Sequence, residues 1–204
     1  MRLIGMLDSP YVRRVAVSMR LMGLDFEHES VSVFRQFDHF ASLNPVVKAP
    51  SLITGEGVVL IDSTLILQHV ERLADPAVRL TPEALGDHLS AQRIIGLALA
   101  ACDKTVQIVY ELNLRPAEKH HQPWLDRVNG QLIAAYDLLE AELAEDGAWR
   151  FGARPMQADV TAAVAWRFTQ FMQPGAVAGH AWPRLQALSE RAEALGAFVD
   201  CPLG

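Results

Sequence analysis

The sequence predicts a two-domain protein, with an α/β domain at the N-terminus and an all-helical domain after it. Up to about residue 74, short apolar runs of strand length alternate with apolar residues at helical spacing. After Pro82 the strand patterns stop and long helical patterns follow, and Ala74-Asp75-Pro76 opens the linker. Mixed elements followed only by helices are typical of two packed domains. We therefore expect one domain over residues 1–76 and another over residues 83–204.

Each element of the first domain has its own signal. Arg2–Met6 is a buried-strand pattern, Val12–Leu21 has helical spacing, and Phe26–Val33 alternates as a strand does. Two further strands flank the hairpin signal Gly55-Glu56-Gly57, and Asp62-Ser63-Thr64 begins a helix because Asp and Ser are good N-caps. The remaining ranges are 36–43 for a short helix or turn, 51–54 and 58–61 for the two strands, and 62–73 for the last helix. This β-α-β-α-β-β-α order matches a thioredoxin-like domain, whereas a long doubly wound sheet would need more strands.

The second domain is predicted to consist of long helices. Their patterns cover residues 83–114, 123–144, 157–171 and 183–195. The breaks between them, at Arg115-Pro116, Asp146-Gly147 and Gln173-Pro174-Gly175, contain the Pro and Gly residues that end helices. This helical half has more apolar surface than one small α/β domain needs to cover. We therefore expect a homodimer in which the first domain of one subunit meets the second domain of the other.

Composition disfavours several classes of function. Half of the 204 residues are hydrophobic, as in an ordinary globular protein, and the net charge of −6 disfavours a nucleic-acid partner. No stretch approaches the roughly 20 apolar residues of a membrane span, and Met1–Met6 is too short for a signal peptide. Cys102 and Cys201 form no disulfide framework or metal cluster, and the adjacent His120 and His121 lack a third ligand. We expect a cytoplasmic protein without a metal, a membrane contact or a nucleic-acid partner.

Ser9 stands where the first predicted strand meets the first predicted helix, and Pro10 follows it. The amides and the dipole of a helix N-terminus favour an anion at this place, which the Ser9 hydroxyl could help to hold. The alternative is structural, since Ser is a preferred N-cap and Pro a preferred first helical residue. Both roles can coexist.

Two further motifs lie between the first helix and the end of the domain. Ala49-Pro50 precedes a strand, where proline is permitted and an X-Pro bond is sometimes cis. Asp62-Ser63 opens a helix, and it presents a hydroxyl and amides to a carboxylate and a side-chain carboxylate to an ammonium. In isolation such a dipeptide is more often a helix cap than a ligand site.

In order and spacing, these motifs resemble the cytosolic glutathione transferases of the serine type. The matching stretches are Ser9-Pro10-Tyr11-Val12, Asn44-Pro45-Val46-Val47-Lys48-Ala49-Pro50 and Asp62-Ser63-Thr64. The first is similar to the Cys-Pro-Tyr-Cys of glutaredoxins with both cysteines replaced, which disfavours thiol–disulfide exchange. Further along, Gly152–Asp159 resembles the capping segment before the core helix of the family, with Asp159 as a structural residue.

The resemblance implies a glutathione transferase that conjugates the thiolate of glutathione, its co-substrate, to small apolar electrophiles, as in detoxification. It also implies a homodimer, and a helical domain that completes the electrophile pocket. The glutathione-binding residues that it implies are Ser9, Lys48, Ala49, Asp62, Ser63 and Asp103. Among these, Ser9 has the catalytic role, because its hydroxyl would stabilise the thiolate and lower the pKa of the thiol.

The other residues are expected to hold the tripeptide. Lys48 lies where relatives place a residue near the glycine carboxylate, and Ala49 would pair through its backbone with the cysteinyl part. Asp62 and Ser63 match the pair that binds the γ-glutamyl end. Asp103 would reach across the dimer to the γ-glutamyl ammonium, although a solvated helix charge is the commoner explanation of such a residue.

Two alternatives to conjugation remain open at this point. One is a glutathione-dependent isomerase or dehalogenase on the same fold, in which glutathione adds to the substrate and leaves again. The other is a non-catalytic transferase-like protein that binds ligands or partners.

Overall fold

The computed structural model describes residues 1–145 and 148–203, so the predicted break at Asp146-Gly147 lies outside the described residues. The chain forms two compact units, one of residues 1–80 with the C-terminal segment from Ala194, and the other of residues 81–193. A small mixed sheet with helices comes first, and the second unit is helical. The predicted fold class is therefore confirmed.

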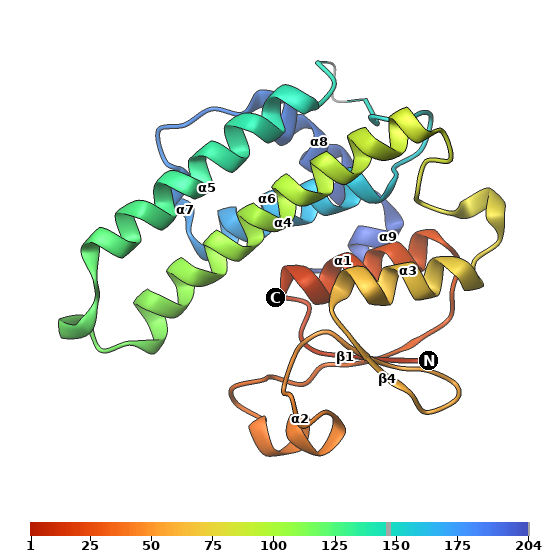
Figure 1. Ribbon diagram of the computed structural model, residues 1–204, viewed down its shortest axis with the longest axis horizontal. Helices are drawn as coiled ribbons and strands as arrows, with labels where there is room; N and C mark the ends of the chain where they lie inside the picture. Colours follow the sequence, from red (N-terminus) through yellow and green to blue (C-terminus); the bar gives the residue numbers. More distant parts are fainter. Residues whose placement is uncertain (146–147, 204) are drawn as a thin grey trace. The chain divides into compact units, whose positions relative to one another are not determined.

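The first unit is built on a four-stranded sheet. Its elements in chain order are β1 (Arg2–Ile4), α1 (Pro10–Leu21), β2 (Glu27–Glu29), α2 (Phe37–Leu43), β3 (Ser51–Ile53), β4 (Val59–Ile61), α3 (Ser63–Leu73) and the 3-10 helix η1 (Pro76–Val78). The strand order is β2-β1-β3-β4, with β1 parallel to β2 and the other two pairs antiparallel. In Figure 1, α1 and α3 lie on one side of this sheet and α2 lies on the other.

Helix α1 is the central helix of this unit. It packs against α3, against β1 and against the C-terminal helix α9 (Gly196–Val199). Its residues Val12, Val15 and Met19 are fully buried, at the i, i+3, i+7 spacing that predicted a helix. On the other side of the sheet, Ile4 and Phe40 share a buried cluster that fixes α2. Burial on both sides of the sheet holds the ends of its strands in fixed positions.

The second unit contains the remaining helices. They are α4 (Leu85–Leu114), η2 (Ala117–Lys119), α5 (Gln122–Glu142), α6 (Gln157–Met172), α7 (Pro174–Val177) and α8 (Pro183–Glu193). Helix α4 packs against α5 and α6, and α8 packs against α6 and α5. The four predicted long helices correspond to α4, α5, α6 and α8. The short helices α7 and α9 were not predicted, because four residues contain little periodicity.

The core of the second unit joins aromatic rings to a chain of buried hydroxyls. The Tyr136 ring lies 5.2 Å from that of Trp166 and 5.3 Å from that of Trp182. The Tyr136 hydroxyl lies 3.0 Å from the Ala165 carbonyl, to which it donates, and 2.5 Å from Thr169 Oγ1. Thr169 in turn contacts Thr105 Oγ1 at 2.7 Å. Each of these buried hydroxyls therefore has partners inside the core, as buried polar groups require.

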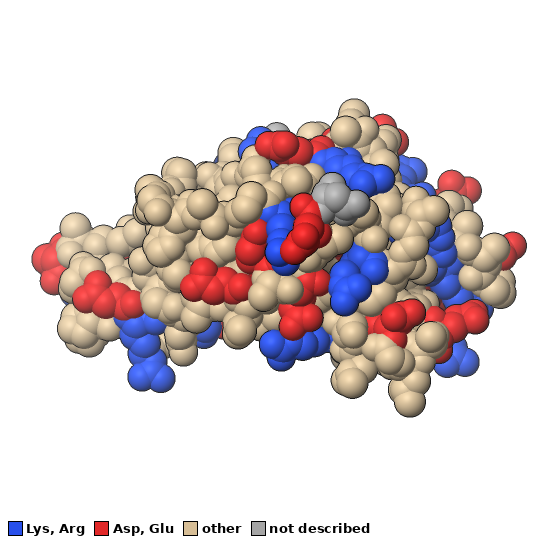
Figure 2. Space-filling model, turned by 90° about the horizontal axis from the view of Figure 1, so that it is seen from above, with Lys and Arg blue, Asp and Glu red and all other residues tan. Residues whose placement is uncertain are grey.

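The charged side chains of the described residues are mixed in sign on the surface that Figure 2 shows, where acidic and basic groups are interspersed. Within residues 1–145 and 148–203, no group of three or more His, Cys, Asp or Glu is placed to hold a metal ion. None of the helices in this part of the chain has the length and apolar character that crossing a bilayer requires. On a face of mixed charge, ligand recognition depends on short-range contacts more than on a long-range field.

Candidate functional site

Three of the sequence motifs leave the sheet at the same edge. Ile4, the last residue of β1, pairs with Ser51, the first residue of β3. Ser51 in turn pairs with Ile61, the last residue of β4. The register therefore brings together the connections that contain Ser9, Lys48-Ala49 and Asp62-Ser63. These residues are far apart in sequence, and the sheet makes them neighbours along one edge.

Gly5 allows the first two of these connections to approach closely. Its φ of +133° is a conformation that favours glycine. A Cβ added at Gly5 would lie 2.7 Å from Cγ2 of Val12 and 3.1 Å from Cβ of Ala49. No side chain fits there, so the loop before Pro50 lies directly against the start of α1.

The backbone of Ala49 is available to a ligand. The Ala49–Pro50 peptide bond is cis, as the sequence allowed. Within the described residues, the N–H and the C=O of Ala49 make no hydrogen bond. The loop is nevertheless fixed, because Ser51 Oγ donates to the carbonyl of Lys48 at 2.8 Å and accepts from Asn44 Nδ2 at 2.8 Å. Ala49 thus presents an ordered donor and acceptor at the edge of the sheet.

Ser9 caps α1 and keeps its hydroxyl proton unused. It has extended backbone angles, and its Oγ accepts a hydrogen bond from the amide of Val12 at 3.5 Å. Pro10 occupies the first position of the helix. Among the described residues, none accepts a hydrogen bond from the Ser9 hydroxyl. The hydroxyl can therefore cap the helix and still donate to an anion.

Asp62 and Ser63 form the start of α3. Asp62 has a φ of +69°, which is uncommon for a residue other than glycine, although Asp adopts it more readily than most, and such conformations are enriched at functional sites. Its Oδ1 accepts from the amide of Thr64 at 2.9 Å, and the side chain is exposed. Ser63 is buried, and its Oγ accepts from Nη1 of Arg14 at 3.1 Å. A carboxylate and a hydroxyl therefore stand side by side where the helix begins.

Lys48 and Asp103 have different surroundings. Lys48 is exposed, and its Nζ makes no hydrogen bond or ion pair with the part of the chain that the structure describes. Asp103 lies on α4, in the second unit, where its Oδ2 accepts from Gln107 Nε2 at 2.7 Å and lies 3.1 Å from Lys104 Nζ. The predicted reach of Asp103 across a dimer stays a prediction.

Two residues near the edge were not identified from the sequence. Arg14 is buried beneath the start of α3, whereas a basic pair in a helix is ordinarily read as solvated. His28 on β2 contacts the carbonyl of Gly5 through Nε2 at 2.7 Å. This contact fixes the end of the strand from which the Ser9 loop departs. The partners of both residues are distant in sequence, so no local pattern could reveal them.

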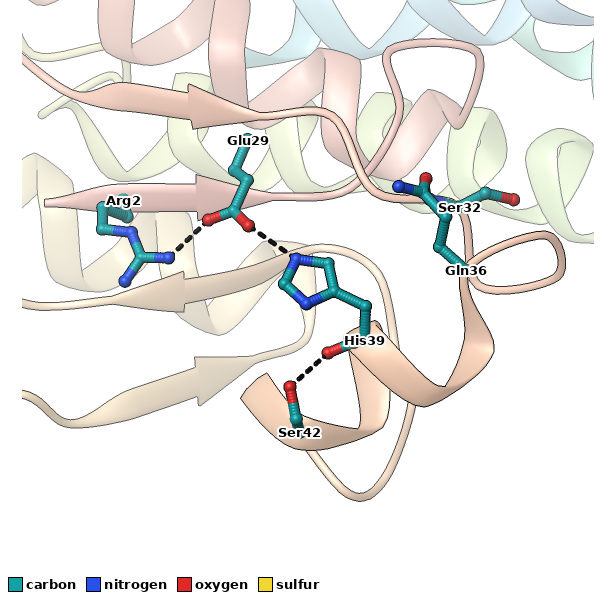
Figure 3. A network of polar contacts seen from close by, with 6 residues as sticks. All are labelled: Arg2, Glu29, Ser32, Gln36, His39 and Ser42. Carbon is teal, nitrogen blue, oxygen red and sulfur yellow. Dashed lines mark hydrogen bonds and ion pairs between the residues drawn. The ribbon is translucent and has the colours of Figure 1, made fainter.

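A polar network ties α2 to the sheet. Figure 3 shows Arg2 and His39 pointing toward the carboxylate of Glu29. Arg2 Nη2 donates to Oε2 of Glu29, and Nε2 of His39 lies 3.0 Å from Oε1. The hydrogen bond from Arg2 lowers the pKa of Glu29, an effect that burial opposes and His39 assists. Both carboxylate oxygens are occupied by protein groups, so this network holds α2 in place.

Two family models match the chain. Residues 3–77 match the N-terminal domain of glutathione S-transferases, and residues 122–191 match their C-terminal domain. Maleylacetoacetate isomerase of Pseudomonas aeruginosa PAO1 is 32% identical over 201 residues, which cover 91% of this chain and 87% of the relative. The uncharacterised GST-like protein YibF of Escherichia coli K12 is 29% identical over 145 residues, which cover 71% of each chain.

Solved structures agree with these matches. A glutathione S-transferase of Methylobacterium radiotolerans JCM 2831, in complex with glutathione sulfonate, superposes with a TM-score of 0.87 at 29% identity, covering 98% of this chain and 93% of its own. A glutathione transferase family member of Pseudomonas fluorescens Pf-5, with bound glutathione, superposes with a TM-score of 0.84 at 26% identity. This match covers 100% of this chain and 98% of that protein. Sequence and fold lead to the same conclusion: the chain belongs to the glutathione S-transferase family.

Proposed function

We propose that this protein is a glutathione transferase that conjugates the glutathione thiolate to small apolar electrophiles. The observation that carries the proposal is the convergence of Ser9, Ala49 and Asp62-Ser63 at one edge of the sheet, each with unused hydrogen-bonding groups. Relatives of similar sequence have been solved with glutathione or glutathione sulfonate bound. In this proposal residues 1–76 bind glutathione, and residues 83–204 complete the pocket that binds the electrophile.

The proposed chemistry begins with the thiol. A glutathione sulfur placed at the start of α1 accepts the Ser9 hydroxyl proton in a hydrogen bond, and the helix dipole adds to the stabilisation of its negative charge. The thiol pKa then falls below the value of about 8.5 for a free thiol, and the proton passes to solvent. The thiolate attacks the electrophile, forming a carbon–sulfur bond while a leaving group departs or a double bond is saturated.

The remaining residues orient the tripeptide, and orientation itself raises the rate. The N–H and C=O of Ala49 pair with the cysteinyl backbone, and Lys48 Nζ attracts the glycine carboxylate. Asp62 attracts the γ-glutamyl ammonium, while Ser63 and the first amides of α3 bind the neighbouring α-carboxylate. We further propose that the enzyme is a cytoplasmic homodimer, which light scattering at micromolar concentration would test against a monomer of 22.5 kDa.

A second candidate function is favoured by one observation. The relative that is 32% identical over nine-tenths of the chain is named maleylacetoacetate isomerase. In an isomerase, glutathione would add to the substrate and leave again, so the same thiolate site would serve without net consumption of glutathione. Dehalogenation would instead release a halide.

The stoichiometry of glutathione separates these functions. The protein is titrated with glutathione by calorimetry and then assayed with aryl halides, epoxides and conjugated cis-enones, while free thiol and product masses are followed. A conjugate formed in equal amount to the glutathione consumed supports the transferase. Isomerised product with glutathione fully recovered supports the isomerase. Halide release without a product that retains glutathione supports the dehalogenase. Binding without turnover indicates a ligand-binding protein, and absence of binding rejects the site.

A further inference from the structure

Two adjacent arginines of α1 are buried and have different partners. Arg14 is 2% exposed, and its Nη1 donates to Ser63 Oγ at 3.1 Å and to Thr64 Oγ1 at 3.2 Å. Arg13 is 1% exposed, but its Nε donates to the carbonyl of Cys201 at 2.8 Å, in the C-terminal segment. Arg14 therefore reaches the start of α3, whereas Nε of Arg13 is directed to the C-terminal segment.

The direction of these hydrogen bonds determines what the start of α3 can bind. A guanidinium only donates hydrogen bonds, so Ser63 and Thr64 must accept from Arg14. Each hydroxyl has one proton, and that proton is then directed away from Arg14. A hydrogen bond received from a cation also polarises the hydroxyl and makes it a stronger donor. Arg14 thus makes the Ser63 and Thr64 hydroxyls donors toward their surroundings.

A donor set of this kind distinguishes between ligand groups. A carboxylate only accepts hydrogen bonds and matches polarised hydroxyls together with the amides of a helix N-terminus. An ammonium only donates, and the exposed carboxylate of Asp62 is an acceptor for it at the start of α3. The start of α3 therefore offers separate places for the two charges of an α-amino acid head group.

We propose that Arg14 is a specificity-determining positioning residue, which orders the hydroxyls of Ser63 and Thr64 and so makes the site selective for γ-glutamyl thiols with a free α-carboxylate. This inference rests on the proposed glutathione function and adds to it. Arg14 acts through the two hydroxyls, and the ligand contacts the hydroxyls rather than the guanidinium.

The test compares two thiols that differ only in the α-carboxylate. They are glutathione and γ-aminobutyryl-cysteinyl-glycine, and their affinities are measured by calorimetry for wild type and for Arg14→Met, Arg14→Lys and Arg13→Met. Arg13→Met is the matched control, because it removes an equally buried guanidinium from the same helix. Circular dichroism establishes that each variant is folded.

We expect wild type to prefer glutathione roughly 10- to 100-fold, the range for hydrogen bonds to a charged group. In Arg14→Met this preference falls to about threefold or less, while affinity for the decarboxylated thiol is unchanged. Arg14→Lys is intermediate, because Lys donates from a single nitrogen without a planar fork. Arg13→Met keeps the wild-type preference. Equal weakening of both thiols in Arg14→Met, or an unchanged preference, would overturn the inference.

Two results separate this inference from the proposed function. If wild type binds neither thiol, the proposed function itself fails and the inference with it. If wild type binds glutathione but Arg14→Met does not fold, a double-mutant cycle of Arg14→Lys with Ser63→Ala decides. Coupling between the two changes in the glutathione preference supports the inference, and additivity within about twofold rejects it.

Discussion

Polar side chains cap α1 and α3 in the first unit and α6 in the second, but these caps differ in how many of their hydrogen-bonding groups have a partner. In the first unit, the Ser9 hydroxyl makes one hydrogen bond, at 3.5 Å, and Asp62 uses one carboxylate oxygen and is exposed. In the second unit, Asp159 caps α6, is 1% exposed, and accepts with both oxygens, from the amides of Met156 at 2.9 Å and Arg150 at 3.0 Å. Unused hydrogen-bonding capacity therefore distinguishes the candidate ligand site from a structural cap.

The same contrast holds for hydroxyl groups. Tyr136 and Thr169 are buried in the second unit, and their hydroxyls contact one another and a backbone carbonyl. Ser9 in the first unit has a proton with no acceptor among residues 1–145 and 148–203. A hydroxyl satisfied within the core contributes stability, whereas one with a free donor at a helix start can contribute to ligand binding. The following predictions test whether this distinction holds.

The largest expected effect is a loss of folding stability when Asp159 is replaced. Asp159→Ala removes both carboxylate hydrogen bonds and leaves the amides of Met156 and Arg150 without their acceptor, so the free energy of unfolding should fall by about 2 to 4 kcal/mol. Urea unfolding at neutral pH measures this loss. The fraction that remains folded should bind glutathione with wild-type affinity. A loss below about 1 kcal/mol would mean that the two oxygens are not needed by the fold, and the contrast with Ser9 would disappear.

The second prediction concerns Ser9, whose replacement should affect activity more than stability, the opposite of Asp159. Ser9→Ala should lower the free energy of unfolding by only about 1 kcal/mol, as expected for a lost N-cap. Conjugation near neutral pH should fall roughly 10- to 100-fold, because a hydrogen bond to the thiolate is lost and the pKa of bound thiol rises. The ultraviolet absorbance of the bound thiolate, followed against pH, measures the pKa directly.

The Ser9 prediction has a matched gain-of-function variant. Ser9→Cys places a thiol at a helix N-terminus, where the thiolate form is favoured. This variant should form a mixed disulfide by exchange with added glutathione disulfide, releasing one glutathione thiolate, and should lose conjugation. If Ser9→Ala leaves both the thiolate titration and the conjugation rate unchanged, Ser9 is only a cap, and Tyr11 or a backbone amide must stabilise the thiolate.

The third prediction concerns the pH dependence of the Arg2–Glu29–His39 network. The folded-state pKa of Glu29 is lowered, first by the hydrogen bond from Arg2, so its stabilising effect is present above the ordinary pKa of 4.5 and is lost as the pH falls through the folded-state pKa. Glu29→Gln should therefore reduce the melting temperature slightly at neutral pH, and this difference should shrink as the pH falls below 4.5 and through the lowered folded-state pKa. Glu83→Gln serves as the control. Because both oxygens of Glu29 are occupied by the protein, conjugation should be unaffected, and a loss of activity at equal stability would place Glu29 in the site.

Local sequence signals were sufficient for most of the fold. The helix over Ser63–Leu73 followed from its Asp62-Ser63 start, and the strands β3 and β4 followed from the hairpin signal Gly55-Glu56-Gly57 between them. The burial of Arg13 and Arg14 did not follow, because their partners Cys201 and Ser63 lie 188 and 49 residues away. The motifs could be recognised one by one, but their meeting at one edge depends on strand register, which is a property of the paired sheet rather than of any segment.

The smallest expected effect is at Asp103. Its substitution tests whether an exposed carboxylate in the middle of α4, in the second unit, also belongs to the site. Asp103 and Asp126 are both exposed helical carboxylates that accept from a Gln four positions away, at 2.7 Å in each case. Asp103→Asn should raise KM for glutathione about two- to fivefold, the range for an exposed charge pair, without changing kcat or stability. Asp126→Asn should change neither constant. The effect of Asp103→Asn requires a second subunit, so it should disappear under conditions in which light scattering finds a monomer. An unchanged KM in a dimer would make Asp103 a solvated helix charge and would confine the glutathione site to the first unit.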